Sequence, residues 1–189
     1  MRALVRPGTP FDPPAGTETI RGEVLEEGIV DRALEGRDAV LSALGIKRKT
    51  RWNPWSALAS PPNLTTRVAM RLVEAMPRHD VSRVVLISAA GVGESIQHVH
   101  PVLRWMINYS SVAASYEELK EMEAVFARSG LDWLAVRPTT LVAGPPTGSV
   151  QAVDRYGMRS RISRGDVAAW MLDALETPEP FTERTPMIG

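Results

Sequence analysis

Several residue types that carry common chemistry are scarce in this sequence. It contains no cysteine, which excludes disulfide bonds and thiol chemistry. Its three histidines form no spaced set of metal ligands, and the close pair His98 and His100 is more typical of a polar loop than of a metal site. We therefore predict that the protein binds no metal ion.

The sequence also lacks an excess of charge of either sign and any long apolar run. The 22 basic and 22 acidic side chains cancel to a formal net charge of zero, which argues against a nucleic-acid footprint or a polybasic membrane patch. No apolar run approaches the length of a membrane span, and the first residues lack the apolar core of a signal peptide. These features predict a cytoplasmic protein that has neither nucleic acid nor membrane as a partner.

The remaining composition is that of an ordinary globular chain. Of its 189 residues, 44% are hydrophobic and 23% are charged, and this length is most simply explained by a single domain over residues 1–189. Residues 46–62 and 139–150 are expected to be loops. Apolar runs of strand length alternate elsewhere with segments of helical spacing, which predicts an α/β fold with a mostly parallel sheet. The expected strands are 2–5, 18–24, 38–45, 82–93, 131–138 and 185–189, and the expected helices are 28–36, 63–76, 115–130 and 163–176.

Capping patterns mark the starts of the longer helices. Asn63 is a candidate N-cap for the helix over 63–76, because its short amide side chain can accept a hydrogen bond from the first turn. Ser115 and Glu118 have the spacing of a capping box, which predicts that the next long helix begins at Ser115.

Ligands of open parallel sheets bind beyond the carboxyl ends of the strands, so function is expected there. These ends hold small residues and few acids or bases, which suits a flat cofactor lying against the backbone better than metal hydrolysis or a nucleophilic triad. The segments concerned are 6–8, 22–24, 44–45, 88–91 and 137–140.

Arg6 is the most informative charge at these strand ends. At the end of the second strand of a dinucleotide-binding fold, an acid accepts from a free ribose 2′-hydroxyl, whereas an arginine pairs with a 2′-phosphate. No acid follows Arg6 until Asp12. If a dinucleotide binds, the sequence favours NADP(H) over NAD(H).

Six stretches occur in an order that resembles a known family: "ALVRPG", "GEVL", "DAVLSALG", "RVVLISAAGVG", "SGLDWLAVRPTTL" followed by "GPPTG", and "SRISRGDVAAWML". Together they resemble the atypical short-chain dehydrogenase/reductase group. The nearest branch resembles the NAD(P)H-binding, biliverdin reductase B/flavin reductase-like proteins, which are also similar to NmrA-like regulators. The resemblance covers nearly the whole chain and implies a Rossmann-like, doubly wound parallel sheet.

The beginning of the chain departs from this family. The family opens with a strand, the turn G-A-T-G-x-T-G and a helix that leads into the "ALVR" strand, whereas this sequence starts at "ALVR". The glycine turn normally holds the pyrophosphate, and the first strand is central in the sheet. We expect strand 38–44 to lack its usual neighbour. Either an upstream start or a truncated relative would explain the difference.

The resemblance also implies the positions of a cofactor site. Arg6 would contact the 2′-phosphate, and segment 92–112 would form a lid over the substrate. Trp105, Met106 and Tyr109 in this lid could stack on a planar aromatic substrate, although ordinary core or oligomer contacts are an alternative. The remaining cofactor contacts would be Glu23 and Val24 beside the adenine, Leu44 and Gly45 along the cofactor backbone, and Ser88, Ala89, Ala90, Pro138 and Thr139 around the nicotinamide.

Candidate catalytic residues are few. The family's usual catalytic serine falls on Ala89, which leaves Ser88 as a possible substitute. Tyr116 and Lys120 have the Y-x-x-x-K spacing of a proton donor beside a lysine. The family lysine falls on Leu119, however, so this spacing is predicted to be a coincidence on a charged helix face.

Two classes of function follow. The first is an NADP(H)-dependent oxidoreductase of a small planar acceptor such as a flavin or a quinone, with the cofactor supplying the hydride. The second is a non-catalytic NADP-binding or interaction protein of the NmrA-like type, or an inactive truncated relative. The sequence leaves the substrate and the oligomeric state open.

Overall fold

A four-stranded parallel sheet forms the centre of the molecule. The computed structural model describes residues 1–50 and 53–189, so the expected loop 46–62 lies partly outside the described residues. The sheet has the order β3-β4-β5-β8, and each neighbouring pair is parallel. This arrangement confirms the α/β fold with a parallel sheet. Its strands are β3 (Ala39–Ser42), β4 (Arg83–Ile87), β5 (Asp132–Pro138) and β8 (Met187–Ile188).

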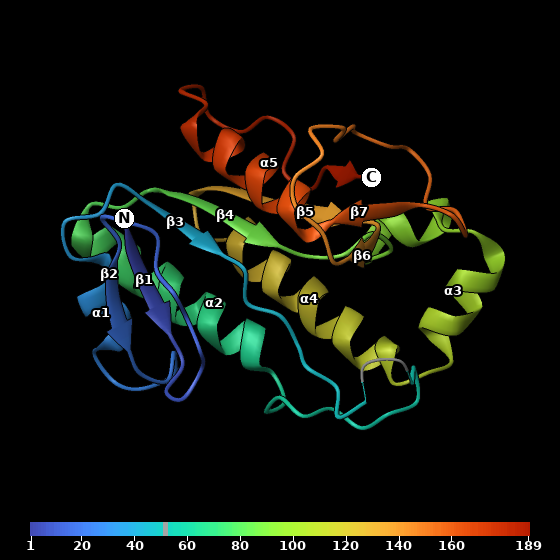
Figure 1. Cartoon of the computed structure of the whole chain (residues 1–189), viewed down its shortest axis with the longest axis horizontal. Coiled ribbons are helices and arrows are strands. Elements are labelled where there is room, and N and C mark those ends of the chain that lie inside the picture. Colours follow the sequence, from blue (N-terminus) through green and yellow to red (C-terminus); the bar gives the residue numbers. More distant parts are fainter. Residues whose placement is uncertain (51–52) are drawn as a thin grey trace.

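Two further strands form a separate sheet beside β3 (Figure 1). Strands β1 (Arg2–Val5) and β2 (Glu18–Arg21) pair in parallel with each other alone. Among the described residues, β3 pairs with β4 and has no strand on its other side. The expectation that this strand lacks its usual neighbour is therefore confirmed.

Helices cover both faces of the central sheet. Alternate β4 residues point to opposite faces, because side chains alternate along a strand. Val84 and Leu86 pack in one core with α1 (Ile29–Leu34), α2 (Leu64–Ala75) and α4 (Val112–Ala127), and this core also includes residues of β1 and β2. Val85 packs on the other face against α5 (Arg164–Glu176). The two-stranded sheet is thus attached to the rest of the molecule through the first core.

The start of α2 is capped by a different residue from the one expected. Asn63 occupies the N-cap position but makes no side-chain capping bond. Instead the buried Glu118 accepts from the Thr65 amide at 2.7 Å and from its hydroxyl at 3.0 Å. The capping box at Ser115 was a wrong prediction, because α4 begins one turn earlier, at Val112. Glu118 therefore joins α4 to the α2 N-terminus, where a carboxylate also complements the helix dipole.

Two segments expected to be irregular contain regular structure. The predicted loop 139–150 begins with β6 (Thr140–Val142), which pairs with β7 (Arg161–Ser163). The predicted lid 92–112 folds into the 3₁₀ helix η2 (Gly93–His98), then α3 (Pro101–Asn108) and the first residue of α4. A further 3₁₀ helix, η1 (Met76–His79), continues α2. Within the described residues, no helix is long and apolar enough to cross a bilayer.

Candidate functional site

The carboxyl ends of β4 and β5 meet at the centre of the sheet edge. The Ser88 amide donates to the Val136 carbonyl at 2.7 Å, and the Ala90 amide donates to the Pro138 carbonyl at 3.0 Å. These bonds bring together the residues predicted around a nicotinamide: Ser88, Ala89, Ala90, Pro138 and Thr139. Leu44 and Gly45 follow the end of β3, the strand next to β4.

The residues predicted around the adenosine lie at the end of the two-stranded sheet. The Gly22 amide donates to the Val5 carbonyl at 3.2 Å, which places the Gly22–Val24 turn beside Arg6. A Cβ at Gly22 would lie 2.6 Å from Ile29 Cδ1, so α1 packs closely against this turn. Arg6 is exposed, and no hydrogen bond or ion pair holds its side chain within the described residues. An unpaired guanidinium at this position is available to an anion.

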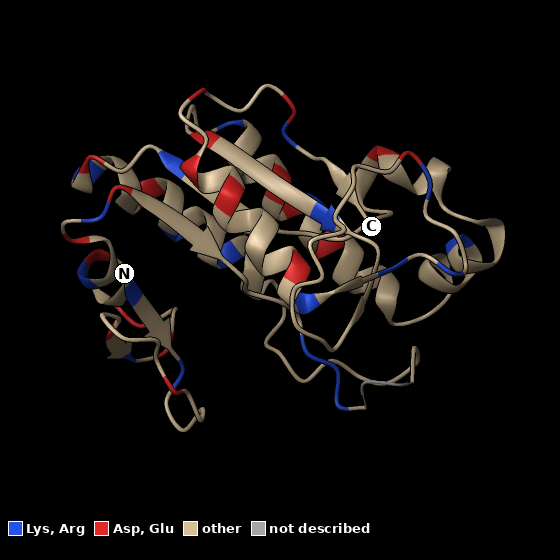
Figure 2. Cartoon of the chain, turned by 45° about the horizontal axis from the view of Figure 1, so that its top comes forward, with Lys and Arg blue, Asp and Glu red and all other residues tan. Residues whose placement is uncertain are grey.

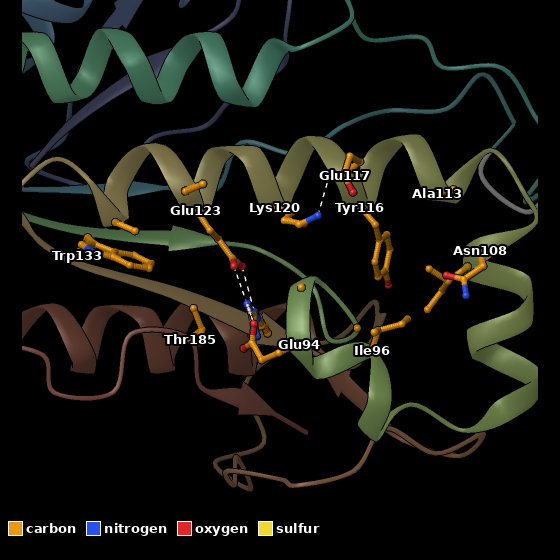
Figure 3. Close-up of a pocket in the computed structure, with 16 residues that line it drawn as sticks. Glu94, Ile96, Asn108, Ala113, Tyr116, Glu117, Lys120, Glu123, Trp133 and Thr185 are labelled. Carbon is orange, nitrogen blue, oxygen red and sulfur yellow. Dashed lines mark hydrogen bonds and ion pairs between the residues drawn. The ribbon is translucent and has the colours of Figure 1, made fainter.

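A buried ionic network lies directly behind Ser88. The guanidinium of Arg137, on β5, donates through Nη2 to Glu123 Oε2 at 2.6 Å and through Nε to Glu123 Oε1 at 3.1 Å. It also contacts Glu94 at the start of η2. The Ser88 hydroxyl donates to Glu123 Oε1 at 2.6 Å. Strand β4, helix α4, strand β5 and the lid therefore meet at Arg137, and Figure 3 shows the dashed contacts between Glu123, Glu94 and the guanidinium.

The charges of this network stabilise one another. Burial disfavours the charge on Arg137, but the carboxylates of Glu123 and Glu94 raise the pKa of its guanidinium above the ordinary value. The hydrogen bond from Arg137 lowers the pKa of the Glu94 carboxyl. Side chains of Arg137 and Glu123 are only 3% and 9% exposed, so neither charge has water to replace its partner. Such a pair is costly to break and holds the strand ends in a defined geometry.

The hydroxyl protons of both candidate catalytic residues are bound by protein acceptors. Tyr116 donates to the Ala90 carbonyl at 3.1 Å, and burial raises the pKa of its phenol above the ordinary range. Lys120 pairs with Glu117, one turn away on the same helix, at 3.0 Å. The Ser88 proton is directed to Glu123. In this arrangement neither hydroxyl is a ready proton donor, while the Ser88 oxygen can still accept a hydrogen bond.

A cleft of about 830 Å³ opens beside this network, between α4, β5 and the segment that contains η2 and α3. Figure 3 shows Tyr116, Glu123, Glu94 and Ile96 around it. Of the residues predicted for the site, Tyr116 lines this cleft. From α3 the lining residues are Ile107 and Asn108, whereas Trp105 and Tyr109 are 57% and 70% exposed. The structure thus leaves the two lid aromatics on the surface.

Glu123 and Arg137 were missed as site residues by the sequence analysis. Arg137 follows an apolar run within β5, and Glu123 lies next to Met122 on the buried side of α4. Each is a charge in a buried run, and buried charges occur in pairs. That pattern could have indicated the pair, although sequence spacing alone could not show that the two side chains meet.

The described residues fit the two ends of a dinucleotide. Thr139 Oγ1 is buried beyond the end of β5 and has no hydrogen-bond partner among the described residues. An unsatisfied hydroxyl is costly, and a polar ligand group could satisfy it. Arg6 could hold a phosphate at the other end. Between β1 and β3, the described residues provide no glycine-rich turn for a pyrophosphate. They also contain no cluster of three or more metal-ligating acids or histidines.

The parallel sheet, the helices on both its faces and the small residues at its carboxyl edge define a Rossmann-like protein of the dinucleotide-binding class. A family model described as NAD(P)H-binding matches residues 1–178. The chain therefore belongs to this NAD(P)H-binding family, and the resemblance drawn from its motifs is confirmed.

Solved structures share the fold at low sequence identity. A putative exported protein from Burkholderia pseudomallei has a TM-score of 0.70 at 22% identity, covering 100% of this chain and 86% of that chain. An anaerobillin reductase from Escherichia coli O157:H7 has a TM-score of 0.70 at 17% identity, covering 92% and 75%. A short-chain dehydrogenase/reductase from Veillonella parvula DSM 2008, in complex with NADP, has a TM-score of 0.68 at 17% identity, covering 92% and 72%.

Proposed function

We propose that this protein is an oxidoreductase that uses NADP(H) in preference to NAD(H) and transfers hydride to a small planar acceptor such as a flavin or a quinone. Arg6 is the observation that carries the cofactor preference. It is exposed at the end of β1, with no ion pair within the described residues. There it would bind the 2′-phosphate, which NAD(H) does not have. A cytoplasmic location remains part of this proposal.

The protein's contribution would be orientation and electrostatics, since the cofactor supplies the hydride when bound. Ser88 would accept from the nicotinamide amide, because its own proton is held by Glu123. Glu23 and Val24 would flank the adenine, and Thr139 would contribute its unpartnered hydroxyl. With the Ser88 and Tyr116 protons engaged, the acceptor would take its proton from water. Flavins and quinones suit such a site, because they accept hydride without an obligatory protein acid.

A second function is favoured by two residues. Ala89 and Leu119 occupy the positions where the family resemblance places a serine and a lysine. A chain without these groups would bind NADP(H) and act through a partner rather than through turnover. This alternative shares the cofactor site with the reductase and differs from it only in chemistry.

Titration of the full chain with NADPH and NADH, followed by cofactor fluorescence, tests the proposed binding. We expect a preference of at least about tenfold for NADPH, because a guanidinium–phosphate contact contributes roughly 1.5–3 kcal/mol. Arg6→Ala should remove the preference, while Arg128→Ala, at an exposed arginine that ends α4, should keep it. Equal affinities for the two cofactors would overturn the NADP(H) assignment.

NADPH oxidation in the presence of menadione or flavin mononucleotide then separates the two functions. Turnover of either acceptor supports the reductase. Cofactor binding without turnover of any planar acceptor supports the non-catalytic alternative.

A further inference from the structure

The charge of this neutral protein is unevenly distributed. Residues 39–73 contain no acid, and neither do residues 95–116. The basic residues of these two segments are Lys47, Arg48, Lys49, Arg51, Arg67, Arg71 and Arg104. In Figure 2 the loop that leads to the grey segment, below the centre of the view, shows blue segments and no red. A net charge of zero therefore conceals two segments that carry basic residues and no acids.

The two acid-free segments are joined in the structure. The Ser111 amide donates to the Pro54 carbonyl at 3.1 Å, and the Ser111 hydroxyl donates to the Ser56 carbonyl at 2.8 Å. Trp55 Nε1 donates to the Tyr109 carbonyl at 3.3 Å. Lys49 is held close to Ala57, because the Lys49 amide donates to the Ala57 carbonyl at 2.9 Å. These bonds hold the two acid-free segments next to each other.

Large apolar side chains are exposed in the same region. Trp55 is 59% exposed, Val102 and Trp105 on α3 are 56% and 57% exposed, and Tyr109, just after α3, is 70% exposed. Val102 and Trp105 are three positions apart and share one face of α3, and Tyr109, the residue that follows the helix, lies next to Trp105. Soluble proteins expose single apolar residues routinely, but a contiguous group with a basic flank indicates an interaction site.

We propose that this surface docks onto an anionic lipid bilayer. The aromatic–basic surface, as we name it, consists of Trp55, Trp105, Tyr109, Lys47, Lys49 and Arg104. Tryptophan and tyrosine side chains favour the headgroup region of a bilayer, and lysines and arginines beside them are attracted to anionic lipids. The charge complementarity is with the lipid phosphates. This inference stands independently of the proposed function and qualifies the expectation that net charge excludes membrane partners.

The shape of the surface favours a bilayer over single-stranded nucleic acid. Platforms for nucleic acid present open aromatic faces on which bases stack. Here the Trp105 and Tyr109 rings lie against each other, with centroids 6.0 Å apart and planes tilted by 35°. Val102, on the same helix face, offers an aliphatic contact rather than a stacking face. Both features suit shallow insertion among lipid headgroups.

Flotation of the full chain with vesicles tests the proposal. We expect binding to vesicles of phosphatidylglycerol and phosphatidylcholine at low salt, release at high salt, and no binding to phosphatidylcholine alone. The double variant Lys47→Glu/Lys49→Glu should weaken binding at least about tenfold, since each basic residue near the membrane contributes on the order of 1 kcal/mol. Trp105→Ala/Tyr109→Ala should weaken it as well, through loss of the inserted side chains.

Matched controls keep the result specific. Arg128→Glu/Arg164→Glu changes the same charge outside the surface, and Leu172→Ala removes an exposed apolar side chain on α5. Both should float like the unchanged protein, and circular dichroism should show that all variants are folded. No flotation with phosphatidylglycerol vesicles would overturn the proposal. So would equal losses in control and surface variants, tighter binding of a single-stranded oligonucleotide, or self-association that the Trp105→Ala/Tyr109→Ala variant abolishes.

Discussion

In the four-stranded sheet, Val84, Val85 and Val136 are fully buried, because helices cover both faces. In the two-stranded sheet, the residues of β1 are all half-buried and Ile20 is the buried residue of β2. Both sheets present predicted cofactor residues at their carboxyl ends. One end of the proposed site is therefore supported by a buried sheet, while the other depends on a pair of strands that is only half-buried.

The largest effect should come from removing Arg137 from the four-stranded sheet. Arg137→Ala leaves the buried Glu123 carboxylate without a counter-charge, and breaking a buried pair costs about 3–5 kcal/mol. Urea unfolding followed by circular dichroism would measure this loss. Arg128→Ala, at an exposed position, should change the free energy of unfolding by less than about 0.5 kcal/mol. If Arg137→Ala lowers the free energy of unfolding as little as Arg128→Ala does, the buried pair does not stabilise the four-stranded sheet.

A pair of core truncations compares the two sheets directly. Phe126→Ala empties a site with 0% exposure beneath the central sheet and should cost about 3–5 kcal/mol. Leu4→Ala in β1 should cost about 1–2 kcal/mol, because Leu4 is only partly buried and truncation leaves a smaller cavity. Thermal and urea unfolding of both variants provide the measurement. Equal decreases in the free energy of unfolding for the two variants would show that the two sheets are packed alike.

Arg2 provides a test confined to the two-stranded sheet. Its Nη1 donates to the Arg32 and Glu35 carbonyls at 2.8 and 2.7 Å, which fastens β1 to the end of α1. Arg2→Met keeps much of the apolar stem but removes these bonds, so we expect a loss of about 1 kcal/mol. Hydrogen exchange should quicken in β1 and β2 and stay unchanged in β4 and β5. Equal acceleration in all four strands would show that the two sheets open together.

The smallest expected effect is a pH dependence at the start of β5. Burial disfavours the charge of Asp132, but hydrogen bonds from the Phe181 amide, Arg83 and Arg184 outweigh burial and lower its pKa. A carboxyl whose pKa is lower in the folded state stabilises the fold above its unfolded pKa, about 3.9. This contribution is lost as the pH falls through the folded value.

Unfolding measured between pH 7 and pH 3 checks this sign. Asp132→Asn should flatten the acid side of the stability profile, whereas Asp173→Asn, an exposed control on α5, should leave it unchanged. Identical acid profiles for the unchanged protein and the Asp132 variant would contradict the assignment.

The sequence predicted those features that depend on local pattern. Alternating apolar periods indicated the parallel sheet, and the helix expected over 163–176 is α5, whose first turn is capped by Ser163. Predictions from the sequence were wrong or missing where the structure depends on contacts between residues far apart in the chain. Glu118 was assigned to its own helix but caps α2 instead, and Arg137 meets Glu123 through the fold alone. The strand β6 was missed because its partner, β7, lies about 20 residues later in the chain.

Hydrogen exchange of the full chain with and without NADPH tests most directly whether one cofactor spans both sheets. We predict that NADPH slows exchange at residues 6–9 and 22–25, which follow β1 and β2 of the two-stranded sheet, and at residues 88–91 and 139–140, which follow β4 and β5 of the four-stranded sheet. Protection at the ends of both sheets would place one dinucleotide across them. Protection at one sheet alone, or at neither, would contradict the proposed site.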